Sequence, residues 1–444
     1  MWRDESVTWQ VAHRPLGAIW ELLGQVDAVH GLYYLLMHAV FLVGDGGAAG
    51  AGGAGGGPGA GGLWALRLPS VAATALAAAG VAAVGHRLAG ERAALWSGAA
   101  YAVLPPVQMY AQEGRSYALV AAAVVWATYL MLRERWIAYA AAMLVACWLH
   151  EFAVLALLAH GVGARRSRGW RWSAAAVAAL LLPLAVVSAR QAEQQLGWLG
   201  RPSWRDWAAY GVLAAVSLLL ARSPALPREL VRVALPLALL PPGLLMAVSL
   251  VHPLYVDRYV LYALAGLALL AGTRLAAARG WWPWLLVAAL LVPFGWWSLW
   301  LRTPESRKDD VLAAAAAVRE RARPGDAVLF LPSRRREWLL SSPDLYGSLR
   351  DLALDRTPAA SHSLQGTELP TERIWTRLVD APRVVALMDP EDQPLDPYPR
   401  EAVKRQTLAS HFERCSVDEV RGARIAVYAR PGHCADRQGD GLSR

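Results

Sequence analysis

Long apolar runs dominate the first two-thirds of the chain. Runs of about 20 residues, enough to cross a hydrocarbon core as a helix, recur between Leu63 and Trp300 with few charges inside them. We predict membrane spans at 64–86, 94–111, 116–132, 172–189, 207–221, 233–251, 258–273 and 281–300. The run 136–164 is too long for one straight span and carries His150 and Glu151 at its centre, so it predicts two short helices that meet there.

The pattern changes after residue 302. Residues 309–323 predict an amphipathic helix, and the short apolar runs 327–332, 383–388 and 424–428 predict buried strands. This alternation favours a small α/β domain. The predicted architecture is a polytopic α-helical membrane protein of about ten transmembrane helices with a C-terminal α/β domain. Its parts are an outer N-terminal segment 1–63 with juxtamembrane helices and a Gly/Ala-rich linker at 44–62, a transmembrane domain 64–302, and the α/β domain 303–444.

The distribution of arginines predicts the orientation. The chain is 56% hydrophobic and 18% charged, and its formal net charge is +9. Arginines gather in alternate loops, which are cytoplasmic by the positive-inside bias: Arg87, Arg92, Arg133, Arg135, Arg165, Arg166, Arg168, Arg171, Arg222, Arg228, Arg232, Arg274 and Arg279. The basic excess therefore indicates a multi-pass protein of the plasma membrane rather than nucleic-acid binding. The N-terminal segment and everything after Trp300 are then extracytoplasmic.

Most other ionisable residues of the membrane part fall in the outward loops. Ionisable groups at membrane depth are costly and mark functional sites by default. The alternative for any one of them is ordinary placement at a loop end. We expect an outward substrate cavity, and its predicted members are Asp27, His30, Glu113, His150, Glu151 and Tyr259.

Four outward segments carry a family resemblance. They are Trp2-Arg3-Asp4-Glu5-Ser6-Val7-Thr8, the stretch 27–36, the stretch 65–70, and Gln112-Glu113-Gly114-Arg115-Ser116-Tyr117-Ala118-Leu119. In this order the series resembles membrane glycosyltransferases of the GT-C fold, over about residues 1–300. More narrowly, it is similar to bacterial relatives of dolichyl-phosphate-mannose–protein mannosyltransferases and of lipid A aminoarabinose transferases.

The resemblance implies that a mannose-like sugar moves from a polyprenyl-phosphate donor to a protein, glycan or lipid acceptor at the outer membrane face. Such transfer needs a carboxylate that takes a proton from the acceptor hydroxyl. The motif assigns this role to Asp4, with Glu5 beside it, although a helix N-terminus often carries the same residue types. The leaving phosphate needs positive charge, for which Arg67, Arg115 and Arg258 are the candidates. No cofactor or metal ligand set is identified, and a requirement for a divalent metal is open.

The sequence departs from the family pattern at its start. In the family a transmembrane helix precedes the Asp-Glu motif, so we expect one further helix encoded upstream of Met1, unless that helix has been lost. A different class of function also stays open, in which the protein is a non-catalytic scaffold or lipid-binding protein derived from the same fold. A transporter is a third option, but no inverted repeats are visible.

The remaining motifs are less specific. Gly50 to Gly55 match a dinucleotide-binding pattern, but no strand precedes them. The run 389–392 resembles the acidic motifs of nucleotide-sugar enzymes, and we interpret it as a solvated turn. Cys147 lies in a predicted span, whereas Cys415 and Cys434 lie in the extracytoplasmic part, where oxidising conditions favour a disulfide between them.

Overall fold

The computed structural model of the protein describes residues 1–47, 59–196, 199–278 and 280–434. By its internal contacts the chain divides into two units. The helical unit comprises Val26–Leu36 and Leu66–Arg302. The α/β unit comprises Met1–Gln25, Met37–Ala65 and Thr303–Arg444. The N-terminal residues contribute to both units. The domain boundaries expected from the sequence, at residues 63 and 302, therefore stay predictions.

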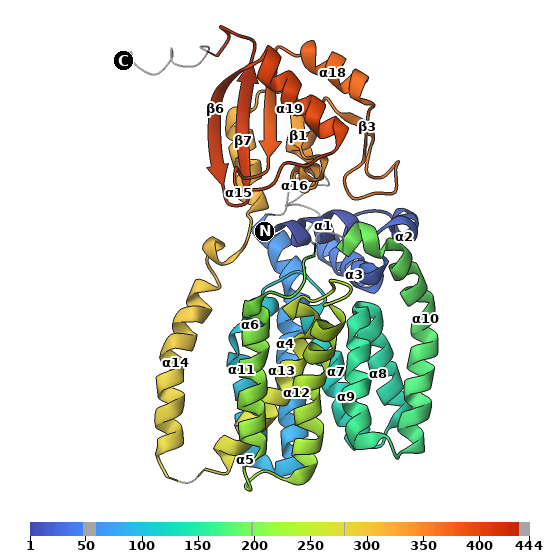
Figure 1. The fold of residues 1–444 in the computed structure, drawn as a ribbon, viewed down its shortest axis with the longest axis vertical. Helices are drawn as coiled ribbons and strands as arrows, with labels where there is room; N and C mark the ends of the chain where they lie inside the picture. The colour runs from blue at the N-terminus through green and yellow to red at the C-terminus, as the bar shows by residue number, and fades with distance from the viewer. Residues whose placement is uncertain (48–58, 197–198, 279, 435–444) are drawn as a thin grey trace. The chain divides into compact units, whose positions relative to one another are not determined.

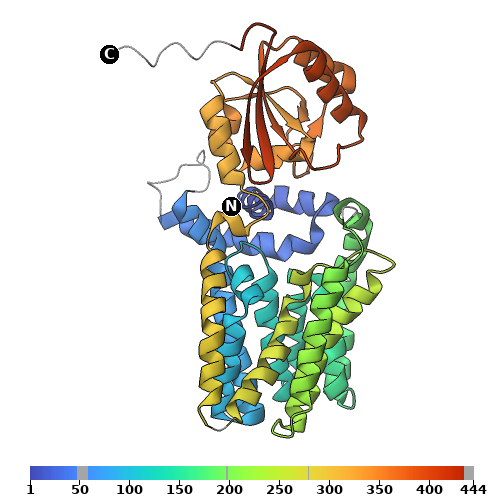
Figure 2. The ribbon, with the colours of Figure 1, turned by 60° about the vertical axis from the view of Figure 1, so that its left-hand side comes forward.

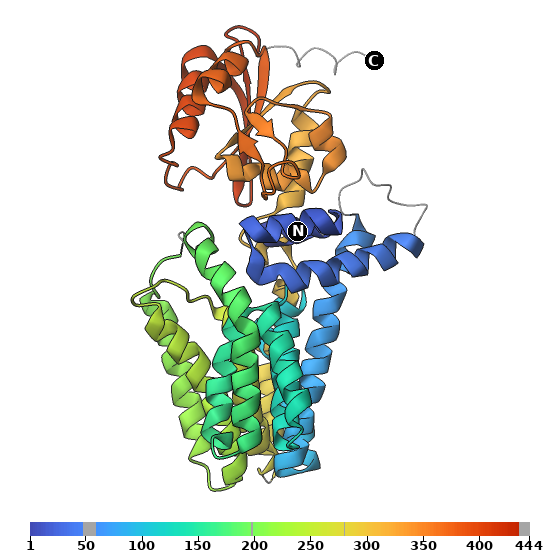
Figure 3. The same ribbon diagram turned by 90° about the vertical axis from the view of Figure 1, so that its right-hand side faces the viewer.

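Apolar helices build the helical unit (Figure 1). After the short 3-10 helix η1 (Ala28–His30) and α3 (Gly31–Gly47), they are α4 (Ala60–Ala89), α5 (Glu91–Val103), α6 (Pro105–Ala111), α7 (Tyr117–Leu132), α8 (Trp136–Leu149), η2 (Glu151–Val154), α9 (Leu155–Ala164), α10 (Arg168–Leu196), α11 (Trp204–Ala221), α12 (Arg228–Val248), η3 (Asp257–Ala263), α13 (Leu264–Ala276) and α14 (Trp282–Trp300). Figures 2 and 3 show helices of this unit running side by side.

Small residues let these helices approach closely. At the contact of α13 with α5, a Cβ atom added to Gly272 would overlap the backbone of Ser97. This is the packing expected where lipid replaces water and close backbone approach supplies the attraction between helices. Helix α12 packs against α9 and α13 in turn, and α7 packs against α8.

Four helices in the described part are long and apolar enough to cross a membrane. They are Gly61–Ala89, Arg168–Ala192, Arg228–Val248 and Asp257–Ala276, of 29, 25, 21 and 20 residues. Shorter apolar helices of 10–17 residues accompany them. The protein is therefore a membrane protein, while the predicted number of about ten spans and their orientation stay predictions.

Two of the apolar runs contain a break. The span expected at 94–111 is wrong as one helix, because α5 ends at Val103 and α6 begins at Pro105. Leu104 is extended there, with φ −62° and ψ 126°, since a residue that precedes proline avoids the helical region. The two helices expected within 136–164 are confirmed: α8 ends at Leu149, and His150 is extended before η2 and α9.

A mixed five-stranded sheet forms the centre of the α/β unit. Its order is β2-β1-β5-β7-β6, with β1 parallel to β2 and β5, and β7 antiparallel to β5 and β6. These strands are β1 (Ala327–Leu331), β2 (Arg350–Asp351), β5 (Arg383–Met388), β6 (Glu413–Val420) and β7 (Ala423–Ala429), and a separate pair is formed by β3 (Leu354–Arg356) and β4 (Thr367–Glu368). The helices are α1 (Arg3–Ala12), α2 (Leu16–Gln25), α15 (Val311–Arg321), α16 (Arg336–Leu340), α17 (Pro343–Gly347), α18 (Thr371–Val379) and α19 (Pro399–His411).

Alternation along the strands sends side chains to both faces of this sheet. Val328 and Phe330 of β1 join one core with α15, α16 and α17. Leu329 and its neighbours join a second core with α18 and α19. Both faces are thus covered by helices, which explains why β1 and β5 read as continuous apolar runs.

Two sequence features of this unit can now be placed. The predicted disulfide between Cys415 and Cys434 is present. Asp389 is not the solvated residue expected in its turn, because its carboxylate accepts bonds from Arg334 and Arg335 at 2.5 Å each. Most of the predicted linker, including Gly50 to Gly55, lies outside the described residues, as does the tail after Cys434.

Candidate functional site

The loop between α6 and α7 is fixed tightly against the start of α4. A Cβ atom added to Gly114 would overlap the side chain of Leu66, so this loop needs a glycine for its close approach. The Ser70 hydroxyl donates to the carbonyl oxygen of Arg115 at 3.0 Å. The backbone N–H of Arg115 donates to the carbonyl oxygen of Glu113 at 2.8 Å. These contacts hold Arg115 in a buried position at 5% exposure.

Arg115 is the end of a hydrogen-bonded chain of side chains. Its NH2 lies 2.7 Å from Nε2 of His30, and Nδ1 of the same ring lies 2.7 Å from Oδ1 of Asp27. Because a guanidinium has only donors, Nε2 must be the acceptor, and Nδ1 must carry the proton that it donates to Asp27. The Tyr34 hydroxyl donates to the other carboxylate oxygen. The chain therefore fixes His30 as a neutral imidazole that orients the guanidinium.

Asp27 serves as the anchor of this chain. Its backbone is left-handed, with φ 63°, a conformation that aspartate tolerates better than most residues. Burial alone would raise the pKa of Asp27, but the interaction with His30, the charge of Arg115 and the bond from Tyr34 hold that pKa well below its usual value. Asp27 thus stays ionised, and its role is to hold His30 rather than to accept a proton from a substrate.

Aromatic rings connect this chain to a second arginine. The ring of His150 lies 6.0 Å from that of His30 and 4.3 Å from that of Tyr259. The guanidinium of Arg258 lies 5.6 Å from the Tyr117 ring and 5.7 Å from the Tyr259 ring. Its Nε also donates to the Tyr117 hydroxyl at 3.0 Å. Such rings orient a cation by cation–π attraction.

Asp257 ties the backbone of this second arginine to α6. Its carboxylate accepts the Arg258 backbone N–H at 2.8 Å, and both of its oxygens lie 3.2 Å from the Tyr110 hydroxyl. His150 adds a buried Nδ1 that has no hydrogen-bond partner within the described residues. The result is a cluster with two oriented guanidinium groups, of which that of Arg115 is buried and that of Arg258 is partly exposed. Such a set is suited to an oxyanion such as phosphate.

The structure brings together four of the residues predicted for the cavity and two of those predicted for the donor phosphate, namely Asp27, His30, His150 and Tyr259 with Arg115 and Arg258. Glu113, two residues before Arg115 in the sequence, is buried. Glu151 interacts with Ser188 of α10. Arg67 is partly buried in α4, one residue after Leu66.

Sequence reasoning missed several partners in the cluster. Tyr34, Tyr110, Tyr117 and Asp257 were not among the predicted site residues. The spacing of Asp27, His30 and Tyr34 is three and four residues, which places them on one helical face and was an available signal.

The Asp4-Glu5 pair belongs to the α/β unit, at the beginning of α1. Glu5 is fully buried, and its Oε2 accepts the backbone N–H of Trp2 at 3.3 Å, so this carboxylate caps the beginning of α1. Asp4 is partly exposed. The backbone N–H of Arg3 donates to Oδ1 of Asp309 at 2.8 Å, and its side chain pairs with Glu337 at 3.0 Å. This helix start is thus anchored at 309 and 337.

Comparison with solved structures identifies the architecture. Two crystal structures of ArnT from Cupriavidus metallidurans superpose over nearly the whole chain. The apo form covers 95% of this chain and 93% of ArnT, with a TM-score of 0.53 and 13% identity. The form bound to undecaprenyl phosphate covers 98% of both chains, with a TM-score of 0.52 and 14% identity. This chain has the fold of ArnT.

ArnT is a lipid A aminoarabinose transferase with the GT-C fold, so the fold expected from the outward motifs is confirmed. At this identity the likeness concerns the fold. No family model matches the chain, and a search of curated proteins also found no match. Within the described residues, no three His, Cys, Asp or Glu side chains are grouped as a metal would require.

Proposed function

We propose that the protein transfers a sugar from a polyprenyl-phosphate donor, and that Arg115 and Arg258 hold the phosphate of that donor. The observation that carries the proposal is the chain from Asp27 through His30 to Arg115, which fixes a buried guanidinium in one orientation. The ArnT fold supports it, because ArnT has been crystallised with undecaprenyl phosphate. The family resemblance adds that the sugar is mannose-like and the acceptor a protein, glycan or lipid.

The proposed reaction needs a positive phosphate site. An acceptor oxygen forms a bond to the anomeric carbon while the bond from that carbon to the phosphate oxygen breaks, and the acceptor proton passes to a carboxylate. The departing polyprenyl phosphate gains a negative charge as the bond breaks. Guanidinium groups that are already oriented stabilise this developing charge without reorganising. Arg67 is proposed as the third cation on the resemblance.

A conservative substitution at Arg115 tests the donor site. Lys keeps the charge but loses the planar fork, and hydrogen bonds to charged groups contribute about 1.5–3 kcal/mol. We expect Arg115→Lys to lower turnover of a radiolabelled polyprenyl-phosphate mannose by roughly 10- to 100-fold. Arg133→Lys, at an exposed position, is the matched control. Equal turnover in the two variants would refute the assignment.

The same assay separates the enzyme from the lipid-binding alternative. Binding of the labelled donor is measured beside its turnover in the parent protein. Saturable binding that Arg115→Lys weakens, without turnover for any acceptor fraction from the cell envelope, would favour the non-catalytic lipid-binding protein.

Asp4 is proposed as the general base. Its support is the family motif, together with the capping bond that engages the neighbouring Glu5. Asp4→Asn removes the basicity at nearly constant size, so turnover should fall about 100-fold or more while donor binding stays within a factor of two or three. Asp355→Asn, at an exposed position, controls for loss of a carboxylate. Full turnover in Asp4→Asn would overturn the assignment.

A further inference from the structure

A second polar pocket lies within the α/β unit, at the carboxyl ends of the central parallel strands. After β1 the chain passes through α16 and α17 to β2 on one side of β1. It then returns through α18 to β5 on the other side. The strand order therefore reverses at β1 and β5. In open α/β sheets, ligands bind at the carboxyl edge where the order reverses.

The pocket has a volume of about 210 Å³. Its lining is mixed, with the polar side chains of Ser333, Gln365, Thr367, Glu368, Arg400 and Glu401 beside the ring of Tyr398. Drug-sized ligands occupy about 300–1,000 Å³, so this pocket suits one small unit rather than an extended chain. Tyr398 is 68% exposed and supplies an aromatic surface beside the polar lining.

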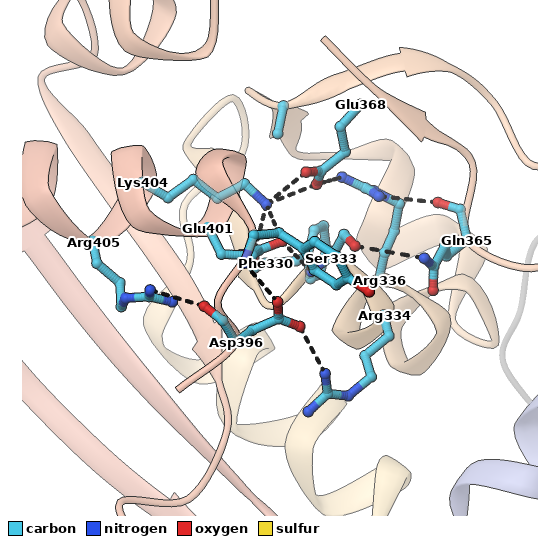
Figure 4. A network of polar contacts seen from close by, with 12 residues as sticks. Phe330, Ser333, Arg334, Arg336, Gln365, Glu368, Asp396, Glu401, Lys404 and Arg405 are labelled. Atoms are coloured by element: carbon cyan, nitrogen blue, oxygen red, sulfur yellow. Dashed lines mark hydrogen bonds and ion pairs between the residues drawn. The ribbon is translucent and has the colours of Figure 1, made fainter. Parts of the chain in front are cut away.

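A buried lysine organises the floor of the pocket (Figure 4). The Lys404 ammonium donates to Glu368 at 2.8 Å, to Glu401 at 3.1 Å and to the carbonyl oxygen of Phe330 at 3.0 Å. Because an ammonium has three N–H groups, its donors are fully used. Arg336 donates to the same Glu368 oxygen at 2.8 Å. The floor is thus rigid, and Glu368 is neutralised by two cations.

Glu401 is left with one unsatisfied oxygen. Its Oε1 accepts the backbone N–H of Ser333 at 2.9 Å and the Lys404 ammonium. Its Oε2 is buried and has no hydrogen-bond partner among the described residues. The Glu401 side chain lines the pocket and is itself only 3% exposed. A buried carboxylate oxygen without a donor is unfavourable, so a hydrogen bond from a ligand in the pocket to Glu401 would be favourable.

The chemistry of the lining selects the ligand class. The cation in the lining, Arg400, is exposed, whereas an anion deeper in the pocket would meet the buried Glu401 carboxylate and be repelled. A neutral molecule with several hydroxyl groups donates to Glu401, exchanges hydrogen bonds with Gln365 and Thr367, and lays a C–H face on Tyr398. We propose that this pocket binds a single neutral sugar ring, free or at the end of a glycan. The proposal is independent of the donor site in the helical unit.

Binding of neutral sugars to the full chain in detergent tests the proposal. Titrations with D-mannose, D-glucose and D-galactose, followed by saturation-transfer NMR, are compared with inorganic phosphate. We expect saturable binding of at least one sugar in the millimolar range, as fits a small and solvated ligand. A mannose-terminated oligosaccharide, added as a competitor, distinguishes a free sugar from a glycan end. Saturation by phosphate alone, or by none of the probes, would overturn the proposal.

Three variants locate the binding. Glu401→Gln keeps the acceptor for Ser333 and Lys404 but puts a donor where Oε2 stands, and it should weaken sugar binding at least tenfold. Tyr398→Ala alters only an exposed side chain and should weaken sugar binding several-fold. The test therefore still holds if Glu401→Gln fails to fold. Glu372→Gln, an exposed position on α18, is the matched control. Sugar binding that both site variants leave at the parent level would place the ligand elsewhere and refute the assignment.

Discussion

Asp309 provides a test of how α1 is anchored in the α/β unit. Its Oδ1 accepts the backbone N–H of Arg3 at the beginning of that helix. Burial and the charge of Asp4 raise the pKa of Asp309, while the bond from Arg3 and the charge of Arg335 lower it, and the net result is a pKa of about 6 instead of the usual 3.8. The anchor therefore carries an electrostatic cost at neutral pH.

The sign and size of this cost follow from proton linkage. Because the pKa is higher in the folded protein, the folded chain binds more protons between pH 3.8 and about 6. The contribution of Asp309 to stability is therefore largest below pH 3.8 and falls as the pH rises to about 6. The difference of 6 − 3.8, at about 1.36 kcal/mol for each pKa unit, corresponds to about 3 kcal/mol at pH 7.

The substitution Asp309→Asn keeps an acceptor for Arg3 and removes the charge. We expect the variant to be more stable than the parent by about 1–3 kcal/mol at pH 7 and equal to it near pH 4. Unfolding of the full chain in detergent is followed by tryptophan fluorescence from pH 4 to 8. Asp355→Asn, exposed on β3, should show no such trend. A variant that is less stable at pH 7, or a difference that is constant with pH, would refute the reasoning.

Three further substitutions test packing and charge. Cys434→Ser opens the disulfide, whose partners lie 19 residues apart, and should lower the free energy of unfolding by roughly 3 kcal/mol, seen as a lower thermal midpoint that dithiothreitol no longer changes. Gly114→Ala forces the loop off Leu66 and should lower donor affinity and turnover together, at least tenfold, whereas Gly17→Ala, with open space around it, should not. Lys404→Met leaves the buried Glu401 without a cation and Glu368 with Arg336 alone, and should destabilise the α/β unit by about 3–5 kcal/mol. The loss is measured by urea unfolding, and one below about 1 kcal/mol, typical of exposed pairs, would contradict the buried network.

The apolar elements of the fold were predictable, including the short strands β1, β5 and β7, whereas its polar strand and its strands of two or three residues were not. The apolar runs of the first two-thirds correspond to helices, because period and length are local properties of the chain. The average hydropathy of a long window is insensitive to the two prolines at 105 and 106, although they interrupt the helix. The break after α5 was therefore missed. Strand β6 was also missed, because an edge strand with one exposed face is mostly polar. Strands β2, β3 and β4 have only two or three residues each, too few for any period to be visible.

For the candidate site, the sequence identified residue types but not their pairings. His30 and Arg115 are 85 positions apart, and Arg258 and Tyr117 are 141 positions apart. Such contacts depend on how the helices pack, which local patterns do not encode. The motifs therefore named loops that the fold brings together, while the contacts by which Tyr34 and Tyr117 orient the charged groups emerged only from the fold.

The distribution of hydrogen bonds narrows the choice of a general base. A general base needs a carboxylate that is not already engaged in hydrogen bonds or ion pairs that hold the fold. Glu5 caps α1, and Asp27 is held ionised by His30. Asp257 supports both Arg258 and Tyr110. Each of these three carboxylates has a structural role. Its substitution would therefore disturb folding or donor binding, and an effect on proton transfer could not be separated from that disturbance.

Asp4 and Glu113 then remain as the acidic residues of the family motifs to compare. Their substitutions should separate cleanly in kinetics. If Asp4 is the base, Asp4→Asn lowers turnover and leaves donor binding intact. The loss of turnover is then greatest for acceptors whose hydroxyl group is a weak nucleophile. If Glu113 instead orients Arg115, Glu113→Gln weakens donor binding and turnover in the same proportion. The opposite pattern, with turnover lost only in Glu113→Gln, would move the base to the loop that carries Arg115.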